Sequence, residues 1–312
     1  MSEDLFRFQI TAQQEEERID KCVAALLDPL SRSYIQRLIK EGRIFVNGTP
    51  VRANYRVKAD DDVSFYLPKA AEPDILPEEI ALDILYEDED VLVVNKPKGM
   101  VVHPAAGHYT GTLVNAVLFH CKGNLSGING VMRPGIVHRI DRDTTGSVIV
   151  CKNDHAHRQI AAQLKAHTIV RRYRAIVCGR LKEDEGVIRA PIGRDPKDRK
   201  KMAINEKNGK EAVTHYRVLE RFEDMTYVEC RLETGRTHQI RVHMASTGHP
   251  VLGDTVYGPS KCPVSGLEGQ TLHAMVLGFL HPVSGLYIET CAPLPEYFEQ
   301  LLLKLRQRGT LR

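Results

Sequence analysis

One nine-residue segment, His-Arg-Ile-Asp-Arg-Asp-Thr-Thr-Gly at 138–146, sets carboxylates among arginines. Asp141 and Asp143 lie two residues apart, close to Arg139 and Arg142. Nearby arginines favour the ionised form of a carboxylate. A positioned, ionised carboxylate is what a nucleophile or the stabiliser of an oxocarbenium ion requires. A surface ion-pair cluster has the same charge pattern, so the pattern alone leaves both interpretations open.

A second segment, residues 232–243, combines a turn with a basic helix. Gly235 permits a tight turn, and Arg236 follows it at a place from which its side chain reaches across a sheet. Thr237 is suited to cap a helix predicted over 238–246. The neighbouring histidines could suggest a metal, but their spacing lacks the H-x-x-x-H of a zinc helix. We therefore expect no metal at His238, His243 and His249.

Two further segments place polar residues at strand ends. Tyr173 begins a predicted strand, 173–178, with arginines around it. Such a tyrosine is either a half-buried packing residue or a platform on which an unpaired base stacks. A strand over 91–95 runs into Lys96-Pro97-Lys98-Gly99, which taken alone indicates a strand and a turn. No Walker phosphate loop is present.

The elements that position these residues fall into two units of different charge. We expect an N-terminal tail at 1–14, a first unit at 15–70, a proline-rich linker at 71–81 and a larger domain at 82–312. The first unit has two predicted helices and short strands. Residues 30–60 carry seven basic and two acidic side chains, a net +5, which favours RNA phosphate binding over an ordinary solvated face.

In the larger domain predicted strands outnumber helices and many are joined by short turns. This pattern favours an α+β fold with a mixed, largely antiparallel sheet over a doubly wound one. Residues 193–210 carry seven basic and three acidic side chains, a net +4, and are interpreted as a mobile basic loop, either solvated or facing phosphates.

The composition excludes several classes of protein. Of 312 residues, 42% are hydrophobic and 27% charged, so the chain is not disordered throughout. No apolar run approaches the ~20 residues of a membrane helix, and the acidic N-terminus is not a secretory signal. Seven scattered cysteines without a C-x-x-C pair fit a reducing cytosol. We expect a cytoplasmic protein and, without any coiled-coil pattern, a monomer.

Taken together and in this order, the four segments resemble the RluA family of pseudouridine synthases, over residues 92–282. The first unit resembles an S4-type RNA-binding domain. The resemblance implies an isomerase without a cofactor that converts uridine to pseudouridine in RNA. It matches Asp141 to the catalytic aspartate and Tyr173 to the tyrosine that stacks on the uracil and is proposed as the base. It matches Arg236 to the arginine that pairs with that aspartate, and Arg139 to the arginine that fills the gap left by the flipped uridine.

The same resemblance, together with the basic strip, supplies the other expected substrate contacts. These are His138, Thr144, Gly146, Lys96 and Arg241 in the larger domain, and Arg32, Arg37, Lys40 and Arg43 in the first unit. The presence of an S4-like unit favours large-subunit (23S) ribosomal RNA as substrate. The alternatives are a relative acting on tRNA or another RNA, and a ribosome-assembly factor that binds RNA without turnover. A glycosidase of free nucleosides would not need two basic surfaces.

Overall fold

The computed structural model describes residues 4–26, 32–67, 75–104, 109–122, 124–128, 134–198 and 201–310. The chain divides into two compact units, Met1–Glu72 and Pro73–Arg312. Among the described residues, no helix is long and apolar enough to cross a membrane.

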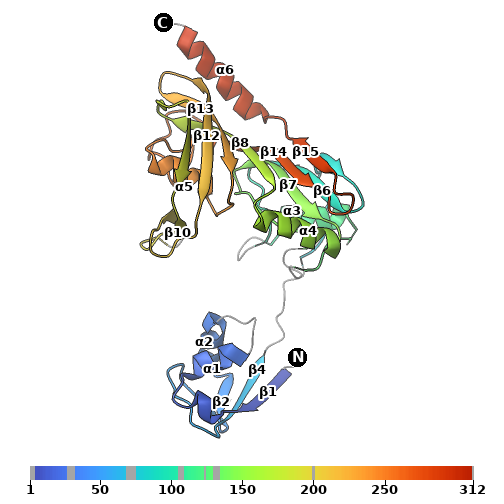
Figure 1. Ribbon diagram of the computed structural model, residues 1–312, viewed down its shortest axis with the longest axis vertical. Helices are drawn as coiled ribbons and strands as arrows, with labels where there is room; N and C mark the ends of the chain where they lie inside the picture. Colours follow the sequence, from blue (N-terminus) through green and yellow to red (C-terminus); the bar gives the residue numbers. More distant parts are fainter. Residues whose placement is uncertain are drawn as a thin grey trace. The chain divides into compact units, whose positions relative to one another are not determined.

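The first unit packs two helices on a small antiparallel sheet (Figure 1). The helices are α1 (Ile19–Leu26) and α2 (Arg32–Lys40), preceded by a short 3-10 turn, η1 (Ala12–Gln14). The strand order is β1 (Asp4–Gln9), β4 (Asp62–Leu67), β2 (Ile44–Val46), β3 (Thr49–Pro50). Asn47 and Gly48, between β2 and β3, both have positive φ, as a two-residue hairpin turn requires. Ile19, Ile35 and Phe65 lie in its buried core.

The boundaries differ from the sequence-based ones at both ends of this unit. The expected N-terminal tail contains β1, which pairs with β4 in register from Asp4–Leu67 to Gln9–Asp62. At the other end, residues 68–74 of the proline-rich stretch lie outside the described residues. The stretch after them packs on the larger unit, where Ile75 is buried in the core and Asn115 Nδ2 donates to the Leu76 carbonyl at 2.9 Å.

The larger unit is built on a nine-stranded sheet, which confirms the predicted α+β class. Its order is β5-β6-β7-β14-β8-β13-β12-β9, with β15 on β14. Within the described residues, β7 and β14 form the one parallel pair. The strands are β5 (Ile84–Glu87), β6 (Val91–Lys96), β7 (Thr145–Cys151), β8 (Val170–Cys178), β9 (Glu185–Arg189), β12 (Val213–Arg221), β13 (Met225–Leu232), β14 (Leu272–Leu280) and β15 (Tyr287–Cys291).

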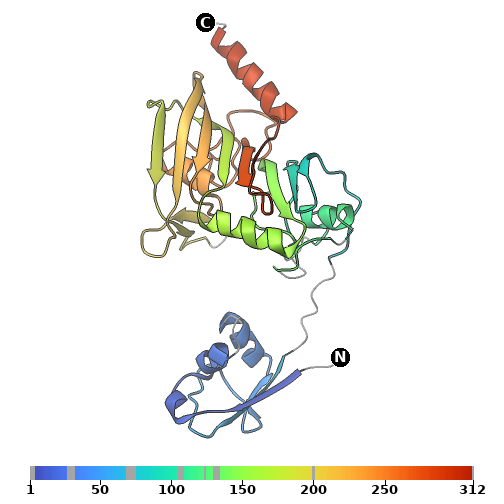
Figure 2. The ribbon, with the colours of Figure 1, turned by 45° about the vertical axis from the view of Figure 1, so that its right-hand side comes forward.

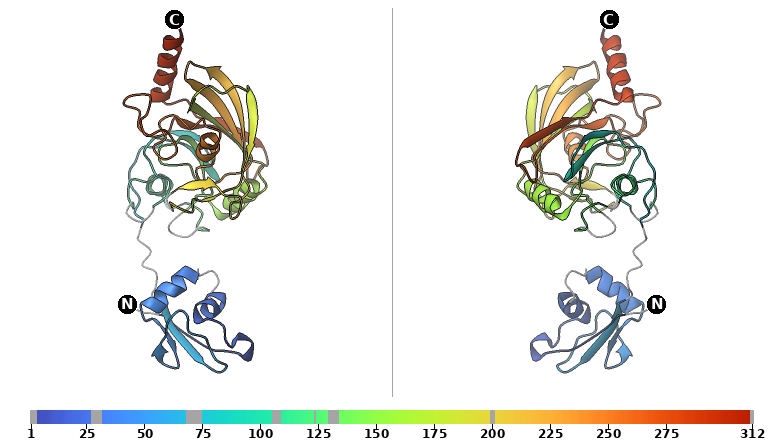
Figure 3. Two further views of the ribbon diagram at one scale, coloured as in Figure 1. Left: turned by 90° about the vertical axis from the view of Figure 1, so that its left-hand side faces the viewer. Right: turned by 90° about the vertical axis from the view of Figure 1, so that its right-hand side faces the viewer.

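Four helices cover this sheet: α3 (Leu113–His120), α4 (Asp154–Lys165), α5 (Gln239–Ser246) and α6 (Glu296–Thr310). Alternate residues of β8 and β13 face α5, so Tyr173, Val228 and Cys230 share a buried cluster with Ile240. α5 lies on the hollow side of the curved sheet (Figure 3). α6 packs Phe298 and its neighbours against the opposite faces of β8 and β13, at one end of the sheet (Figure 2).

The basic segment 193–210 is not a plain loop. It contributes the hairpin of β10 (Ile192–Arg194) and β11 (Met202–Ile204), paired from Ile192–Ile204 to Arg194–Met202. Residues 199–200 lie outside the described part. Ile192, with Val242 of α5, belongs to a small buried cluster that anchors this hairpin beside the helix.

Candidate active site

Asp141 lies in the loop that leads into β7 and faces α5. Arg241 Nη1 donates to Asp141 Oδ2 at 2.9 Å, while His238 Nε2 lies 3.8 Å from Oδ1. The Asp141 side chain is 18% exposed, whereas that of Arg241 is 6% exposed. One carboxylate oxygen is therefore bound to a charged partner, and the side chain keeps some exposure to solvent.

The guanidinium of Arg241 is itself fixed by a buried carboxylate, Asp254. Arg241 Nε donates to Asp254 Oδ2 at 2.6 Å, and Nη2 donates to Oδ1 at 2.9 Å. The backbone N–H groups of Val256 and Tyr257 also donate to Oδ1. Burial disfavours the charged guanidinium, but Asp254 and Asp141 outweigh it and raise the pKa of Arg241. Burial likewise disfavours the Asp254 carboxylate, yet its hydrogen bonds and Arg241 lower its pKa. Sequence reasoning missed Asp254.

The arginine that pairs with Asp141 is therefore Arg241, not Arg236 as the resemblance implied. Arg236 Nε donates to the Glu211 carbonyl at 2.9 Å. The physical reason is where the helix begins. His238, not Thr237, is the N-cap, and it has a left-handed backbone with φ of 58°. Because of this turn, the Arg236 side chain lies at the cavity wall, whereas the Arg241 side chain lies on the face of α5 toward Asp141. The Arg236 backbone N–H donates instead to Gln239 Oε1.

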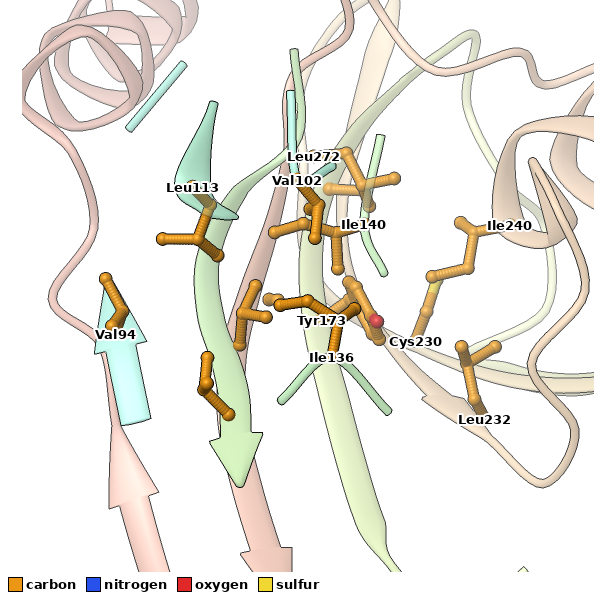
Figure 4. Packing of buried hydrophobic residues seen from close by; sticks show 14 of the residues in the cluster. Val94, Val102, Leu113, Ile136, Ile140, Tyr173, Cys230, Leu232, Ile240 and Leu272 are labelled. Atoms are coloured by element: carbon orange, nitrogen blue, oxygen red, sulfur yellow. The ribbon is translucent and has the colours of Figure 1, made fainter. Parts of the chain in front are cut away.

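Tyr173 is the fourth residue of β8 rather than its first. Only 8% of it is exposed, and its ring lies in the main core cluster with Ile140 and Leu272 (Figure 4). Burial raises the pKa of its hydroxyl, Arg171 opposes that shift and Asp141 adds to it. Tyr173 is therefore a neutral phenol at neutral pH, held by packing on one side and facing the cavity on the other.

His138 and Arg139 have different surroundings. His138 Nε2 accepts a hydrogen bond from the Ile149 backbone N–H at 3.0 Å, which ties the Asp141 loop to β7. Burial, aided by the charge of Arg171, lowers the pKa of His138 to about 3, so its ring is neutral. Arg139 is exposed, and its Nη1 lies 3.3 Å from His103 Nε2. Of the two, Arg139 is the side chain with room to move.

Lys96 has a structural place that the sequence did not indicate. It is fully buried, and its Nζ donates to the carbonyls of Pro97, Met100 and Arg142 at 2.8–2.9 Å. All three donors are thus used inside the protein, and none is left for RNA. The bond to Arg142 clamps the residue next to Asp141. Burial lowers the pKa of Lys96 to about 7, against the charges of Asp143 and Asp141.

Gly146 and Thr144 are also buried beneath the loop. A Cβ on Gly146, whose φ is +107°, would overlap the Ala274 backbone where β7 pairs with β14. Packing, rather than substrate, therefore requires this glycine. Thr144 is 2% exposed and accepts a hydrogen bond from Gln270 Nε2 at 3.1 Å. It lines a small hollow next to Asp141, where substrate contact stays a prediction.

A cavity of about 520 Å³ opens beside Asp141 and is lined by most of these side chains. Its wall includes Arg139, Tyr173, Arg236 and His238, and it extends to the end of α4. A smaller hollow lined by Asp141, Tyr173, Ile240 and Leu272 adjoins it. The partly buried Asp141 carboxylate therefore lies at a cavity wall that also holds the ring of Tyr173 and several cationic side chains.

The basic strip of the first unit is only partly described. Lys40 is exposed at the end of α2, and Arg43 pairs with Glu41 at 3.4 Å. The side chains of Arg32 and Arg37, both on α2, lie outside the described residues. Their substrate contacts stay predictions.

The ring nitrogens of His238, His243 and His249 do not converge on a common point. His238 Nδ1 contacts the Tyr257 hydroxyl, both nitrogens of His243 bond to Thr214 and Ala190, and His249 Nδ1 contacts the Cys178 carbonyl. In the described part of the chain, one cluster has metal-ligand spacing: Asp88, Asp90 and His281. Its groups already bond to one another, and Asp88 also accepts from the Tyr86 hydroxyl, which indicates a structural latch between two turns.

Comparison with known proteins agrees with this geometry. The family model described as RNA pseudouridylate synthase matches residues 90–246, and the S4 domain model matches residues 17–63. An uncharacterized RNA pseudouridine synthase of Bacillus subtilis (strain 168) is 54% identical, covering 97% of this chain and 99% of the relative. Ribosomal large subunit pseudouridine synthase D of Zymomonas mobilis is 50% identical, covering 92% and 93%.

A solved structure agrees as well. Human RNA pseudouridylate synthase domain containing 1 superimposes with a TM-score of 0.57 at 26% identity, covering 73% of this chain and 96% of that one. The chain belongs to the RNA pseudouridylate synthase family, with an S4 domain in its first unit. It is an isomerase that converts uridine to pseudouridine in RNA.

Proposed function

We propose that this enzyme isomerises specific uridines of large-subunit ribosomal RNA, in the cytoplasm and as a monomer. Two facts support this substrate. The Zymomonas mobilis relative, which is 50% identical, is named for the ribosomal large subunit. The S4 domain adds an RNA-binding unit with a net positive charge between residues 30 and 60. A cation strip of this kind binds phosphates independently of sequence.

The observation that carries the catalytic assignment is the partly buried Asp141 carboxylate at the cavity wall. Arg241 binds Oδ2 at 2.9 Å and is locked in turn by Asp254. Asp141 also lines the cavity. A charge-assisted bond of this kind holds a carboxylate in one orientation. We assign Asp141 as the catalytic residue, and Arg241 and Asp254 as the residues that position it.

A uridine inside a paired stem must leave the stack before its sugar can meet Asp141, at a cost of a few kcal/mol. Arg139 is suited to fill the gap because it is exposed at the cavity rim. Tyr173 is suited to contact the flipped uracil through its ring, since the residue is packed in the core and also lines the cavity. Aromatic contact of this kind is the usual way proteins hold an unstacked base.

The isomerisation itself is balanced without an external reactant. The N1–C1′ bond breaks, the uracil turns, and a C5–C1′ bond forms; C5 then loses its hydrogen as a proton, and N1 gains one. Asp141 either attacks C1′ or removes the C2′ proton to give a glycal, and both routes use the same carboxylate group. Tyr173 is the candidate base for the C5 proton; because burial keeps its phenol neutral, it takes that proton as it gives its own to N1 of the uracil.

Tritium release tests the proposal. Large-subunit ribosomal RNA, transcribed with uridine tritiated at C5, is incubated with the wild type and with Asp141→Asn. We expect release from the wild type alone, with RNA binding retained by the variant, because the amide keeps the shape of the carboxylate but cannot act as nucleophile or base. Substantial release by Asp141→Asn contradicts the catalytic assignment. Release from tRNA but not from ribosomal RNA or intact subunits contradicts the substrate assignment.

A further inference from the structure

The cavity beside Asp141 continues past the residues that the reaction uses. Beyond Tyr173 it is lined by Lys165 at the end of α4, by His167 and by Arg171 of β8. We call Lys165, His167, Arg171 and Gly235 the basic arm. None of these has a part in the mechanism above. A flipped nucleotide, however, brings its own backbone, because two phosphates are attached to the ribose that Asp141 must reach.

Arg171 is the strongest feature of the basic arm. It is two residues before Tyr173 on β8, so the two side chains point to the same face of the sheet. It is only 7% exposed, and its Nη2 donates to the Glu233 carbonyl at 3.0 Å, but its Nε is buried without a hydrogen-bond partner. Arg171 also lines the cavity, so the part of its guanidinium that faces the cavity is placed to meet an anionic ligand.

The backbone opposite Arg171 is shaped to admit its head group. A Cβ on Gly235 would overlap Arg171 Nη1, so the guanidinium lies directly against this glycine at the cavity wall. Gly235 does not have a left-handed φ, so its lack of a side chain serves this close approach rather than a turn. The sequence singled out Gly235 for a turn; the structure gives it this second purpose.

The charge balance of the cavity indicates the chemical class of the ligand. Among the described residues, its wall carries the cations Arg139, Lys165, Arg171 and Arg236 and one acidic residue, Asp141, which is already paired with Arg241. Burial lowers the pKa of Arg171; Tyr173 opposes this shift and the neighbouring charge of Arg236 adds to it. An anion in the basic arm would relieve this repulsion. A lysine at the end of a helix also stabilises that helix, but this effect does not explain Arg171.

We propose that the basic arm is a subsite for an RNA backbone phosphate next to the flipped uridine, with Arg171 as its buried donor and Lys165 at its mouth. The proposal rests on the proposed function, because it takes the nucleotide at Asp141 as given. The planar guanidinium of Arg171 suits phosphate oxygens, and Gly235, which lacks a Cβ, leaves room for it. The phosphate would thus anchor the nucleotide in the cavity and contribute to RNA binding.

Two variants probe the subsite without touching Asp141 or Tyr173. Lys165→Gln removes an exposed charge at the mouth, and Gly235→Ala pushes the Arg171 head group from its place. Lys304→Gln, an exposed lysine of α6, is the matched control. The probe is the large-subunit ribosomal RNA transcript tritiated at C5. KM and kcat come from tritium release, and Kd from filter binding over a series of salt concentrations.

We expect Lys165→Gln and Gly235→Ala to raise KM about tenfold, the size of one charge-assisted hydrogen bond, with kcat changed less than about twofold. For Lys165→Gln the slope of log Kd against log salt should fall by about 0.7–0.9, the loss of one phosphate contact. Lys304→Gln should change neither quantity. Salt slopes equal to that of the wild type for Lys165→Gln, or a loss confined to kcat, overturn the subsite.

A single substituted linkage then identifies the phosphate. Short RNAs carrying the mapped uridine receive an uncharged methylphosphonate at one position at a time. One position should weaken binding to the wild type but not further weaken binding to Lys165→Gln, the coupling expected of direct partners. Equal losses for both proteins at every position contradict the proposal. If the wild type binds RNA but releases no tritium from any RNA, the isomerase assignment fails, while the salt slopes still decide the subsite.

Discussion

Replacing Arg241 with lysine tests whether its guanidinium holds Asp141 in a working position. Arg241 makes three charge-assisted bonds, two to Asp254 and one to Asp141. Lysine keeps the charge but presents a single nitrogen, which cannot reproduce a bidentate bond and a third contact together. Asp254 is fully buried, so we expect the ammonium to stay with it and Asp141 to lose its partner.

The size of the effect follows from these contacts. A hydrogen bond to a charged group contributes about 1.5–3 kcal/mol. Since ~1.4 kcal/mol is a factor of ten in rate, losing the bond to Asp141 should lower kcat about 10–150-fold. Breaking a buried pair outright costs about 3–5 kcal/mol. At ~2–4 °C per kcal/mol for a unit of this size, Tm should fall by about 20 °C at most.

The assay is single-turnover tritium release at saturating RNA, below the Tm of the variant. Arg306→Lys is the matched control, because Arg306 makes the same bidentate bond to Glu220 but at the surface, where an ion pair contributes about 0–1 kcal/mol. The control should keep full activity and nearly full stability. An Arg241→Lys protein that is folded and turns over within twofold of the wild type refutes the reasoning.

Three further outcomes are expected. Tyr173→Phe should bind RNA normally but leave it unprocessed or partly processed, as judged by tritium release and by gel shift; normal turnover excludes a role for the hydroxyl. Deletion of residues 1–72 should sharply lower activity on large-subunit RNA, whereas an enzyme of tRNA would lose little. His138→Gln should flatten the pH dependence of unfolding. The His138 pKa of about 3 in the folded protein lies below its ordinary value, so unfolded chains bind more protons between those pH values and stability falls as pH drops through them. The wild-type slope there should exceed that of the variant by at most about 1.4 kcal/mol per pH unit in urea unfolding, and equal slopes contradict the assignment.

The sequence predicted well those helices and strands whose signals, apolar periodicity and turn residues, lie within the element itself. The strand predicted at 91–95 matches β6 to within one residue, and the helix predicted over 238–246 matches α5 apart from His238, which is its N-cap. Strand β1 was missed because its pairing partner, β4, lies more than fifty residues away, and an isolated acidic end gives no sign of it. The choice between Arg236 and Arg241 could not be made from spacing, because the left-handed His238 interrupts the helical period assumed across that segment.

The sequence also could not show which polar side chains are buried. Lys96 at the end of a strand has the pattern of an exposed residue, yet three backbone carbonyls enclose its ammonium. Asp254 sits in a segment, 248–258, whose three glycines and one proline indicate turns. A carboxylate shortly after a helix that carries an arginine is the signal that could have found it. Such pairs are decided by packing between distant segments, which no local pattern records.

The parallel pairing of β7 with β14 also has a consequence for the order of events during synthesis. Thr145 meets His273 across 128 residues of chain, and Asp141 meets Arg241 across 100. At ~5–20 residues per second, the ribosome makes Asp141 about 5–20 s before its partner. The first unit, complete by residue 72, is free to fold long before that. A chain that stops short of Asp254 therefore carries the aspartate without its complete clamp, so synthesis must pass residue 254 before the clamp can form.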